Sequence, residues 1–118
     1  MIKGIGIDMV EIKRILRAME KNERFVYRIL TASELELYHT LESMHRKVEF
    51  VAGRFAAKEA LGKAMGTGIG SCFSFQDIAV SRGEHGKPMM DVKGCEEKIW
   101  VSISHSQSHA IAQVIVEI

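Results

Sequence analysis

The spacing of apolar residues changes once along this chain, and that change limits the folds it can adopt. Residues 11–65 carry apolar side chains at helical spacing, whereas most of residues 73–118 alternate apolar and polar side chains. An Ile- and Val-rich segment at residues 2–10 comes first and predicts a buried strand. Helices followed by strands, around one amino-terminal strand, predict an α+β fold. We expect a single small domain over residues 1–118, with a mainly antiparallel sheet packed on a long central helix.

Cap and turn signals divide the two parts into elements. Thr31 and Glu34 match a capping box that begins a short helix ending near Leu41. A helix over about residues 11–30 precedes it, and a break near Asn22 is left open. A longer helix over about residues 46–65 follows, and Gly66 is a suitable residue to end it. Strands are expected at residues 73–81, 89–92, 100–105 and 110–118, with a turn at 82–88.

The composition predicts one globular domain, and we expect it in the cytoplasm because the start of the sequence does not resemble an export signal. Of 118 residues, 47% are hydrophobic and 26% are charged, which argues against disorder. No apolar run approaches the roughly 20 residues needed to cross a membrane. Lys3 and Asp8 are among the residues that interrupt the amino-terminal segment, so it does not read as a signal peptide. Cys72 and Cys95 have no metal-binding spacing and are expected to be reduced thiols.

Positive charge is concentrated in one segment. The whole chain has a net charge of +1, which argues against a nucleic-acid partner, yet residues 13–28 contain six basic and two acidic side chains. That segment is therefore +4, and the rest of the chain is −3. Five of its basic residues are spaced 3, 4, 3 and 4 apart, which places them on one helical stripe: Arg14, Arg17, Lys21, Arg24 and Arg28. A solvated helix face and a docking surface for an acidic partner both fit this basic stripe.

Three charged residues suggest phosphate chemistry when they are considered together. Asp8 ends the first strand, where a helix cap is the ordinary interpretation. Glu59 and Lys63 are four residues apart, where a surface ion pair is the ordinary one. Together, two carboxylates suit Mg²⁺ and one ammonium suits a phosphate oxygen. Arg54 and Lys58 form a further pair of like charge, which is costly unless an anion lies between them or both point into water.

The other candidate features are weaker. The glycines of residues 66–70 follow a helix, whereas phosphate-binding glycine loops precede one, so they predict a helix end and a turn. His105 lies between serines and is expected to share a strand face with Val101 and Ile103. It is either a hydrogen-bonded core histidine or a catalytic one. The chain has no Gly-x-Ser-x-Gly motif, which argues against a hydrolase triad.

Five motifs in order resemble those of the holo-[acyl-carrier-protein] synthase family, the short, trimeric type of 4'-phosphopantetheinyl transferase. They are GIGIDMVEI at 4–12, GRFAAKEALGKAMGTG at 53–68, FSFQDIAV at 73–80, GKP at 86–88 and VSISHS at 101–106. The resemblance implies the 4'-phosphopantetheinyl transferase fold. It also implies magnesium-dependent transfer of 4'-phosphopantetheine from coenzyme A to a serine hydroxyl of apo acyl carrier protein. The products would be holo acyl carrier protein, for fatty acid biosynthesis, and adenosine 3',5'-bisphosphate.

The resemblance also assigns roles to residues and implies a homotrimer with active sites between subunits. Asp8 and Glu59 would be the Mg²⁺ ligands, Lys63 would neutralise or protonate the departing phosphate, and His105 would complete the catalytic set. Coenzyme A would contact Arg46, Lys63, Gly66, Lys87, Pro88 and His105. The acidic carrier protein would dock on Arg14, Arg24, Phe25 and Arg28.

A different class of function is a binding module without chemistry. Such a module would use the basic stripe to dock an acidic protein or RNA. It would account for the charge of residues 13–28, but it would leave the combination of Asp8, Glu59 and Lys63 unexplained.

Overall fold

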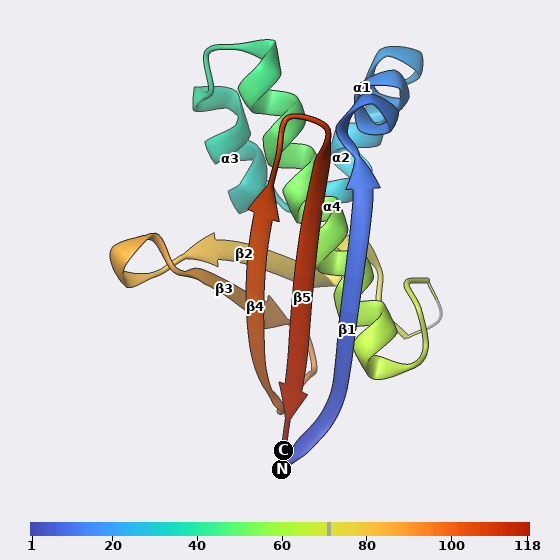
Figure 1. Cartoon of the computed structure of the whole chain (residues 1–118), viewed down its shortest axis with the longest axis vertical. Helices are drawn as coiled ribbons and strands as arrows, with labels where there is room; N and C mark the ends of the chain where they lie inside the picture. Colours follow the sequence, from blue (N-terminus) through green and yellow to red (C-terminus); the bar gives the residue numbers. More distant parts are fainter. Residues whose placement is uncertain (71) are drawn as a thin grey trace.

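The computed structural model describes residues 1–70 and 72–118 and confirms an α+β fold (Figure 1). One strand and four helices come first: β1 (Ile2–Glu11), α1 (Ile12–Lys21), α2 (Arg24–Ile29), α3 (Ala32–Thr40) and α4 (Met44–Met65). Four strands follow, namely β2 (Ile78–Arg82), β3 (Pro88–Val92), β4 (Lys98–His105) and β5 (His109–Glu117). Short 3₁₀ turns at Phe75–Asp77 and Glu84–Gly86 flank β2.

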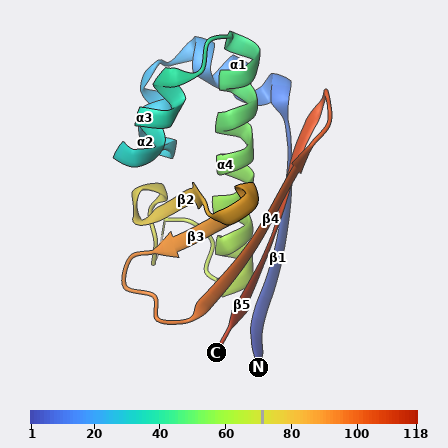
Figure 2. The same ribbon diagram turned by 90° about the vertical axis from the view of Figure 1, so that its left-hand side faces the viewer.

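The strands form two antiparallel sheets on either side of α4. The larger sheet has the order β1-β5-β4, and β2 pairs with β3 in a separate hairpin. In the side view, α4 runs between the three-stranded sheet and a second layer that contains the hairpin, α2 and α3 (Figure 2). The long central helix predicted from the sequence is therefore α4, and both layers pack against it. No helix in the described part of the chain is long and apolar enough to cross a membrane.

Two glycines of β1 allow α4 to lie directly on this strand. A Cβ atom on Gly4 would lie 2.0 Å from the carbonyl oxygen of Ala64, and one on Gly6 would lie 2.0 Å from that of Ala60. Real side chains cannot occupy such space, so only glycine permits this approach. Asp8, two residues beyond Gly6, lies on the same face of β1, so its side chain is also directed toward α4.

The expectation that residues 2–10 form a buried strand was wrong for one face. Gly6 and Val10 face α4 and are buried, whereas Ile5, Ile7 and Met9 are 57%, 53% and 63% exposed. The reason is that α4 covers only one face of the sheet, so the alternate side chains of β1 project from the other. The residues of β1 therefore belong alternately to two surfaces, one buried against α4 and one exposed.

The helical boundaries largely follow their predicted signals. The chain does break at Asn22, whose backbone is extended and whose Oδ1 accepts a hydrogen bond from the Arg24 backbone N–H at 2.9 Å. The basic stripe is therefore divided between α1 and α2. The capping box of Thr31 and Glu34 is present, and Gly66 ends α4 in the left-handed conformation at φ 78°.

The predicted strand at residues 73–81 was wrong in its first half. Asp77 Oδ2 accepts hydrogen bonds from the backbone N–H of Ser74 at 3.0 Å and from its hydroxyl at 3.2 Å. This capping interaction folds Phe75–Asp77 into a 3₁₀ turn, so β2 begins only at Ile78.

Candidate active site

The fold brings Asp8, Glu59 and Lys63 together at the contact between β1 and α4. The Lys63 ammonium lies 3.0 Å from Asp8 Oδ1, so its ion pair spans 55 positions of the chain. Glu59 lies one turn before Lys63 on α4. Burial and the nearby charge of Asp8 raise the pKa of Glu59, while Lys63 and Arg14 lower it. Asp8 does not cap α1, which has Glu11 at its N-cap, and Lys63 pairs with Asp8 while it also acts on Glu59. The three residues therefore form one cluster of two carboxylates and an ammonium.

This cluster has the chemistry of a magnesium site. The raised pKa of Glu59 reflects, in part, its repulsion by Asp8, and a divalent cation between two carboxylates would relieve that repulsion. Among the described residues, no group of three or more His, Cys, Asp and Glu is placed to hold a metal ion. Two carboxylates, completed by water and substrate phosphate oxygens, are a usual arrangement for Mg²⁺. The residues present therefore fit this ion.

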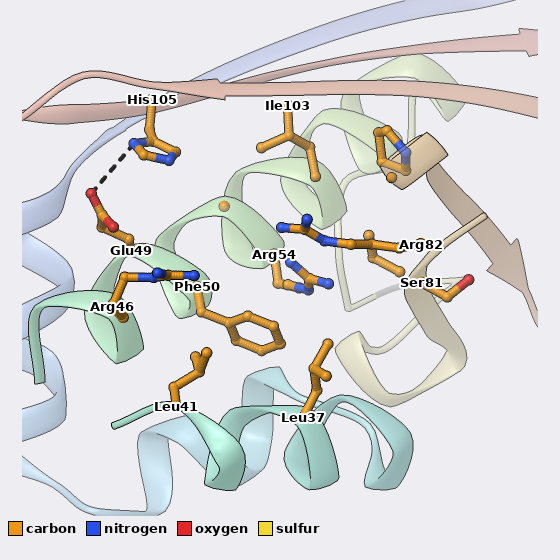
Figure 3. Close-up of a pocket in the computed structure, with 14 residues that line it drawn as sticks. Leu37, Leu41, Arg46, Glu49, Phe50, Arg54, Ser81, Arg82, Ile103 and His105 are labelled. Carbon is orange, nitrogen blue, oxygen red and sulfur yellow. Dashed lines mark ion pairs between the residues drawn. The ribbon is translucent and has the colours of Figure 1, made fainter. Parts of the chain in front are cut away.

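A second feature, separate from this cluster, is a cavity of about 460 Å³ with several cationic side chains in its lining. It lies between α3, α4, β4 and the β2–β3 hairpin (Figure 3). Its lining includes the carboxylate of Glu49 and four basic side chains: Arg46, Arg54, Arg82 and His105. Most of the remaining lining is apolar: Leu37, Leu41, Phe50, Gly53, Val80, Pro88 and Ile103, with Ser81 and Gly86 also present. A ligand with both phosphate groups and a flat apolar ring would match this lining.

Arg54 is the most unusual residue of this cavity, and sequence reasoning did not propose it as a ligand. Its guanidinium carbon lies 3.9 Å from the centroid of the Phe50 ring, and the residue is only 6% exposed. Its Nε and Nη2 atoms are buried and have no hydrogen-bond partner among the residues that the structure describes. Burial lowers the pKa of Arg54, and Arg82 lowers it further. A buried cation with free donors calls for an acceptor from outside the chain.

Lys58, four residues from Arg54, points away from the cavity and is not a ligand candidate. Its ammonium is fully buried and donates to Glu34 Oε1 at 2.6 Å and to the carbonyl of Ile29 at 2.7 Å. Burial lowers the pKa of Lys58, and Glu34 opposes that change. Both cations are buried rather than directed into water, and the Glu34 carboxylate raises the pKa of each of them. An anion of the chain itself therefore offsets part of the repulsion in this like-charged pair.

His105 is held by a carboxylate that the sequence did not indicate. Its Nδ1 lies 3.4 Å from Glu49 Oε2, and the same oxygen lies 3.3 Å from His45 Nε2. The dashed line in Figure 3 marks the contact of His105 with Glu49. The side chain of His105 is 51% exposed, so it is not a core histidine. With Nδ1 directed at Glu49, the other ring nitrogen is free to face a ligand.

Of the remaining residues predicted to contact coenzyme A, some line the cavity and others do not. Arg46 and Pro88 line the cavity with His105. Lys87 instead lies over the Trp100 ring, with its ammonium 4.9 Å from the ring centroid. Gly66 lies at the end of α4, beside open space.

The predicted docking residues lie on α1 and α2. Arg14, Arg24 and Arg28 are exposed, whereas Phe25 is half-buried with its ring 6.2 Å from that of Phe55. Arg14 is close enough to Glu59 to lower its pKa. The basic surface therefore adjoins the carboxylate cluster.

Within one chain, the carboxylate cluster and the cavity are separate. Asp8 is on β1 and His105 is on β4, at opposite edges of the sheet with β5 between them. Among the described residues that line the cavity, none belongs to the group Asp8, Glu59 and Lys63. A ligand that needs both groups would have to reach around α4 or use a second copy of the chain.

Comparison with known proteins identifies the class. The family model of the 4'-phosphopantetheinyl transferase superfamily matches residues 4–114. The chain therefore belongs to that superfamily and is a transferase, which disfavours the binding module without chemistry.

Its similar proteins are more specific. The chain is 56% identical to a holo-[acyl-carrier-protein] synthase of Geobacillus sp. (strain WCH70), over 99% of this chain and 98% of the relative. A crystal structure of such a synthase from Bacillus anthracis, in complex with coenzyme A (3',5'-ADP), matches with a TM-score of 0.91. That match has 49% identity and covers 99% and 97% of the two chains. The Helicobacter pylori synthase in complex with coenzyme A matches at 0.83, with 36% identity over 96% and 99%. The resemblance read from the five motifs is confirmed.

Proposed function

We propose that this chain transfers 4'-phosphopantetheine from coenzyme A to a serine hydroxyl of apo acyl carrier protein, with Mg²⁺ as its metal ion. The products are holo acyl carrier protein and adenosine 3',5'-bisphosphate, and the reaction serves fatty acid biosynthesis in the cytoplasm. The observation that carries the proposal is the cluster of Asp8, Glu59 and Lys63, which joins a metal-competent carboxylate pair to an ammonium. The names of the synthase relatives and the bound coenzyme A of two structural neighbours support it.

In the proposed reaction, each residue of the cluster has a separate task. Asp8 and Glu59 would hold Mg²⁺, which supplies Lewis-acid stabilisation of the pyrophosphate when bound. Lys63 places a positive charge beside this site, where it neutralises or protonates the departing phosphate. Arg14 lies near Glu59 on the docking surface, so a carrier protein bound there presents its serine close to the cluster.

We assign the cationic cavity to the nucleotide end of coenzyme A. Arg46, Arg54 and His105 supply donors for its phosphate groups, and Arg54 has buried donors that otherwise lack partners. Phe50 and Ile103 supply apolar surface for the adenine ring. This assignment accounts for an excess of cations that the chain itself does not neutralise.

A transfer assay tests the proposed function directly. Apo acyl carrier protein is incubated with the protein, coenzyme A and Mg²⁺, and its mass is measured. We expect the carrier to gain one phosphopantetheine group, and omission of the protein or the metal to prevent the gain. A carrier of unchanged mass in the complete mixture would refute the proposal.

The Arg54→Met variant tests the cavity assignment. Methionine keeps an unbranched apolar stem but removes the guanidinium donors, so we expect KM for coenzyme A to rise about tenfold, as for the loss of one or two charged hydrogen bonds. KM for the carrier protein should stay unchanged. The Arg28→Ala variant on the docking surface is the reciprocal control, because it should raise only KM for the carrier protein. An unchanged KM for coenzyme A in Arg54→Met would refute the assignment.

We further propose a homotrimer whose active sites lie between subunits. Exposed apolar side chains occupy the outer face of the sheet, opposite α4: Ile5, Ile7, Met9, Trp100 and Ile111. An apolar face of this kind normally lies against another protein surface. Assembly would also allow the carboxylate cluster of one copy to face the cavity of another, which one chain keeps apart.

The Ile7→Glu variant tests this assembly. A carboxylate placed in the centre of the apolar face would be desolvated on association, which strongly opposes it. We expect the mass from light scattering to fall from that of three chains to that of one. Met44→Glu is a matched control, because Met44 is 60% exposed at the start of α4, away from the sheet, and should leave the mass unchanged. A wild-type protein with the mass of one chain would refute the trimer.

A further inference from the structure

Side chains from outside the helix hold the C-terminal end of α2. This helix has only six residues, too few to be stable in isolation, and the last carbonyl groups of any helix lack partners within it. Gln76 Nε2 donates to the carbonyl oxygens of Tyr27 and Leu30 at 2.7 Å each, and to that of Arg28 at 3.3 Å. Lys58 Nζ donates to the carbonyl of Ile29 at 2.7 Å. Four consecutive carbonyl groups therefore accept hydrogen bonds from two side chains.

The turn that carries Gln76 is itself well anchored. Ser74 and Asp77 close it with a capping box, and the carbonyl of Asp77 accepts a hydrogen bond from the Lys93 backbone N–H at 2.8 Å. The ring of Phe75 stacks on that of Phe55, with 5.7 Å between the centroids. Gln76 therefore projects from a rigid turn, and its amide group can hold the short helix α2 in a fixed position.

The direction of α2 sets where the predicted docking residues point. Arg24, Phe25 and Arg28 all lie on this helix, and the two arginines are exposed. We propose that Gln76 is a positioning residue for carrier-protein recognition: it fixes α2 so that its cationic side chains meet an acidic protein surface in the right register. This inference rests on the proposed function, and it adds a residue that none of the docking assignments contains.

The experiment compares Gln76→Ala and Gln76→Glu with the wild type in two measurements. The first is amide hydrogen exchange of α2 in the protein alone, which reports how firmly the hydrogen bonds of Gln76 hold this helix when no substrate is bound. The second is steady-state transfer kinetics with each substrate varied in turn. We expect faster exchange in α2 and a rise of about tenfold in KM for the carrier protein, as for the loss of two hydrogen bonds. KM for coenzyme A should be unchanged. Gln76→Glu should be at least as impaired, because a carboxylate would face three carbonyl oxygens.

The Thr40→Ala variant is the matched control. The hydroxyl of Thr40 donates to the Leu37 carbonyl at 2.6 Å, so it also satisfies a carbonyl near a helix end, but on α3. It should leave KM for the carrier protein and exchange in α2 unchanged. Lys58 is unsuitable for this purpose because its buried ion pair also supports the fold.

Three results would overturn the inference. Unchanged exchange in α2 of Gln76→Ala would show that the amide does not hold the helix. Faster exchange with an unchanged KM for the carrier protein would show that the carrier does not need a fixed helix. An equal rise in KM for both substrates would show a general loss of structure. If the wild-type protein transfers nothing, the proposed function itself is refuted. The wild-type assay alone shows that result, so it cannot be confused with an effect of Gln76.

Discussion

The Glu59→Gln variant is expected to lower kcat/KM for transfer about 10³-fold while the protein stays folded. An amide has the shape of the carboxylate but not its charge, so it would hold a divalent cation poorly. Asp8 alone would then share the site with Lys63, whose ammonium lies 3.0 Å from it and repels a cation.

The same substitution is expected to leave the stability of the fold unchanged or slightly higher. Burial and Asp8 raise the pKa of Glu59, which means that the folded protein disfavours its ionised form. A carboxylate whose pKa is raised on folding costs stability at a pH above its folded pKa. That cost disappears as the pH falls below the unfolded value. Glutamine removes this cost at neutral pH, so activity and stability should move in opposite directions.

Transfer assays and thermal unfolding, run on the same preparations, measure both effects. Glu36→Gln is a matched control, since Glu36 is exposed on α3 and the change alters the net charge equally. It should retain full activity. The metal role of Glu59 would be refuted if Glu59→Gln transferred at the wild-type rate. A large fall in the melting temperature would instead show that Glu59 supports the fold.

Residues whose roles follow from local spacing could be predicted from the sequence. Glu59 and Lys63 are one helical turn apart, and the chemistry of their side chains groups them with Asp8; the structure shows that Asp8 and Lys63 do lie in contact. Asn22 broke the helix where its short polar side chain could cap the next turn. For the Glu59 and Lys63 spacing and for the Asn22 break, residues within one or two helical turns determine the structure, whereas the approach of Asp8 depends on the packing of β1 against α4.

Residues whose roles depend on distant partners could not be predicted. Arg54 gains its significance from burial against Phe50 and from donors left without partners, neither of which has a signal along the chain. Glu49 meets His105 only because α4 crosses the inner face of the sheet. The exposed alternate side chains of β1 could not be told from those of a buried strand, because they are apolar as well, and only the packing of α4 decides which face is covered.

Lys58 is another residue whose role depends on distant partners. Its replacement is expected to have the second large effect. The Lys58→Met variant should lower the free energy of unfolding by about 3–5 kcal/mol, because it leaves the Glu34 carboxylate buried without its cation. Glu34 is 2% exposed, and its oxygens also accept hydrogen bonds from the backbone N–H groups of Thr31 and Val80 at 2.8 Å each. One ion pair therefore joins α4 to the start of α3 and to β2.

Urea denaturation measures this loss, and a second substitution identifies its cause. The Lys58→Met/Glu34→Gln double variant should recover part of the stability, since it removes the uncompensated charge, while the one amide oxygen can still accept from the backbone N–H of either Thr31 or Val80. Lys13→Met on the exposed face of α1 is the control for loss of a lysine charge, and it should change stability by less than about 0.5 kcal/mol. A loss of under about 1 kcal/mol in Lys58→Met would contradict the prediction, because a buried carboxylate cannot lose its cation so cheaply.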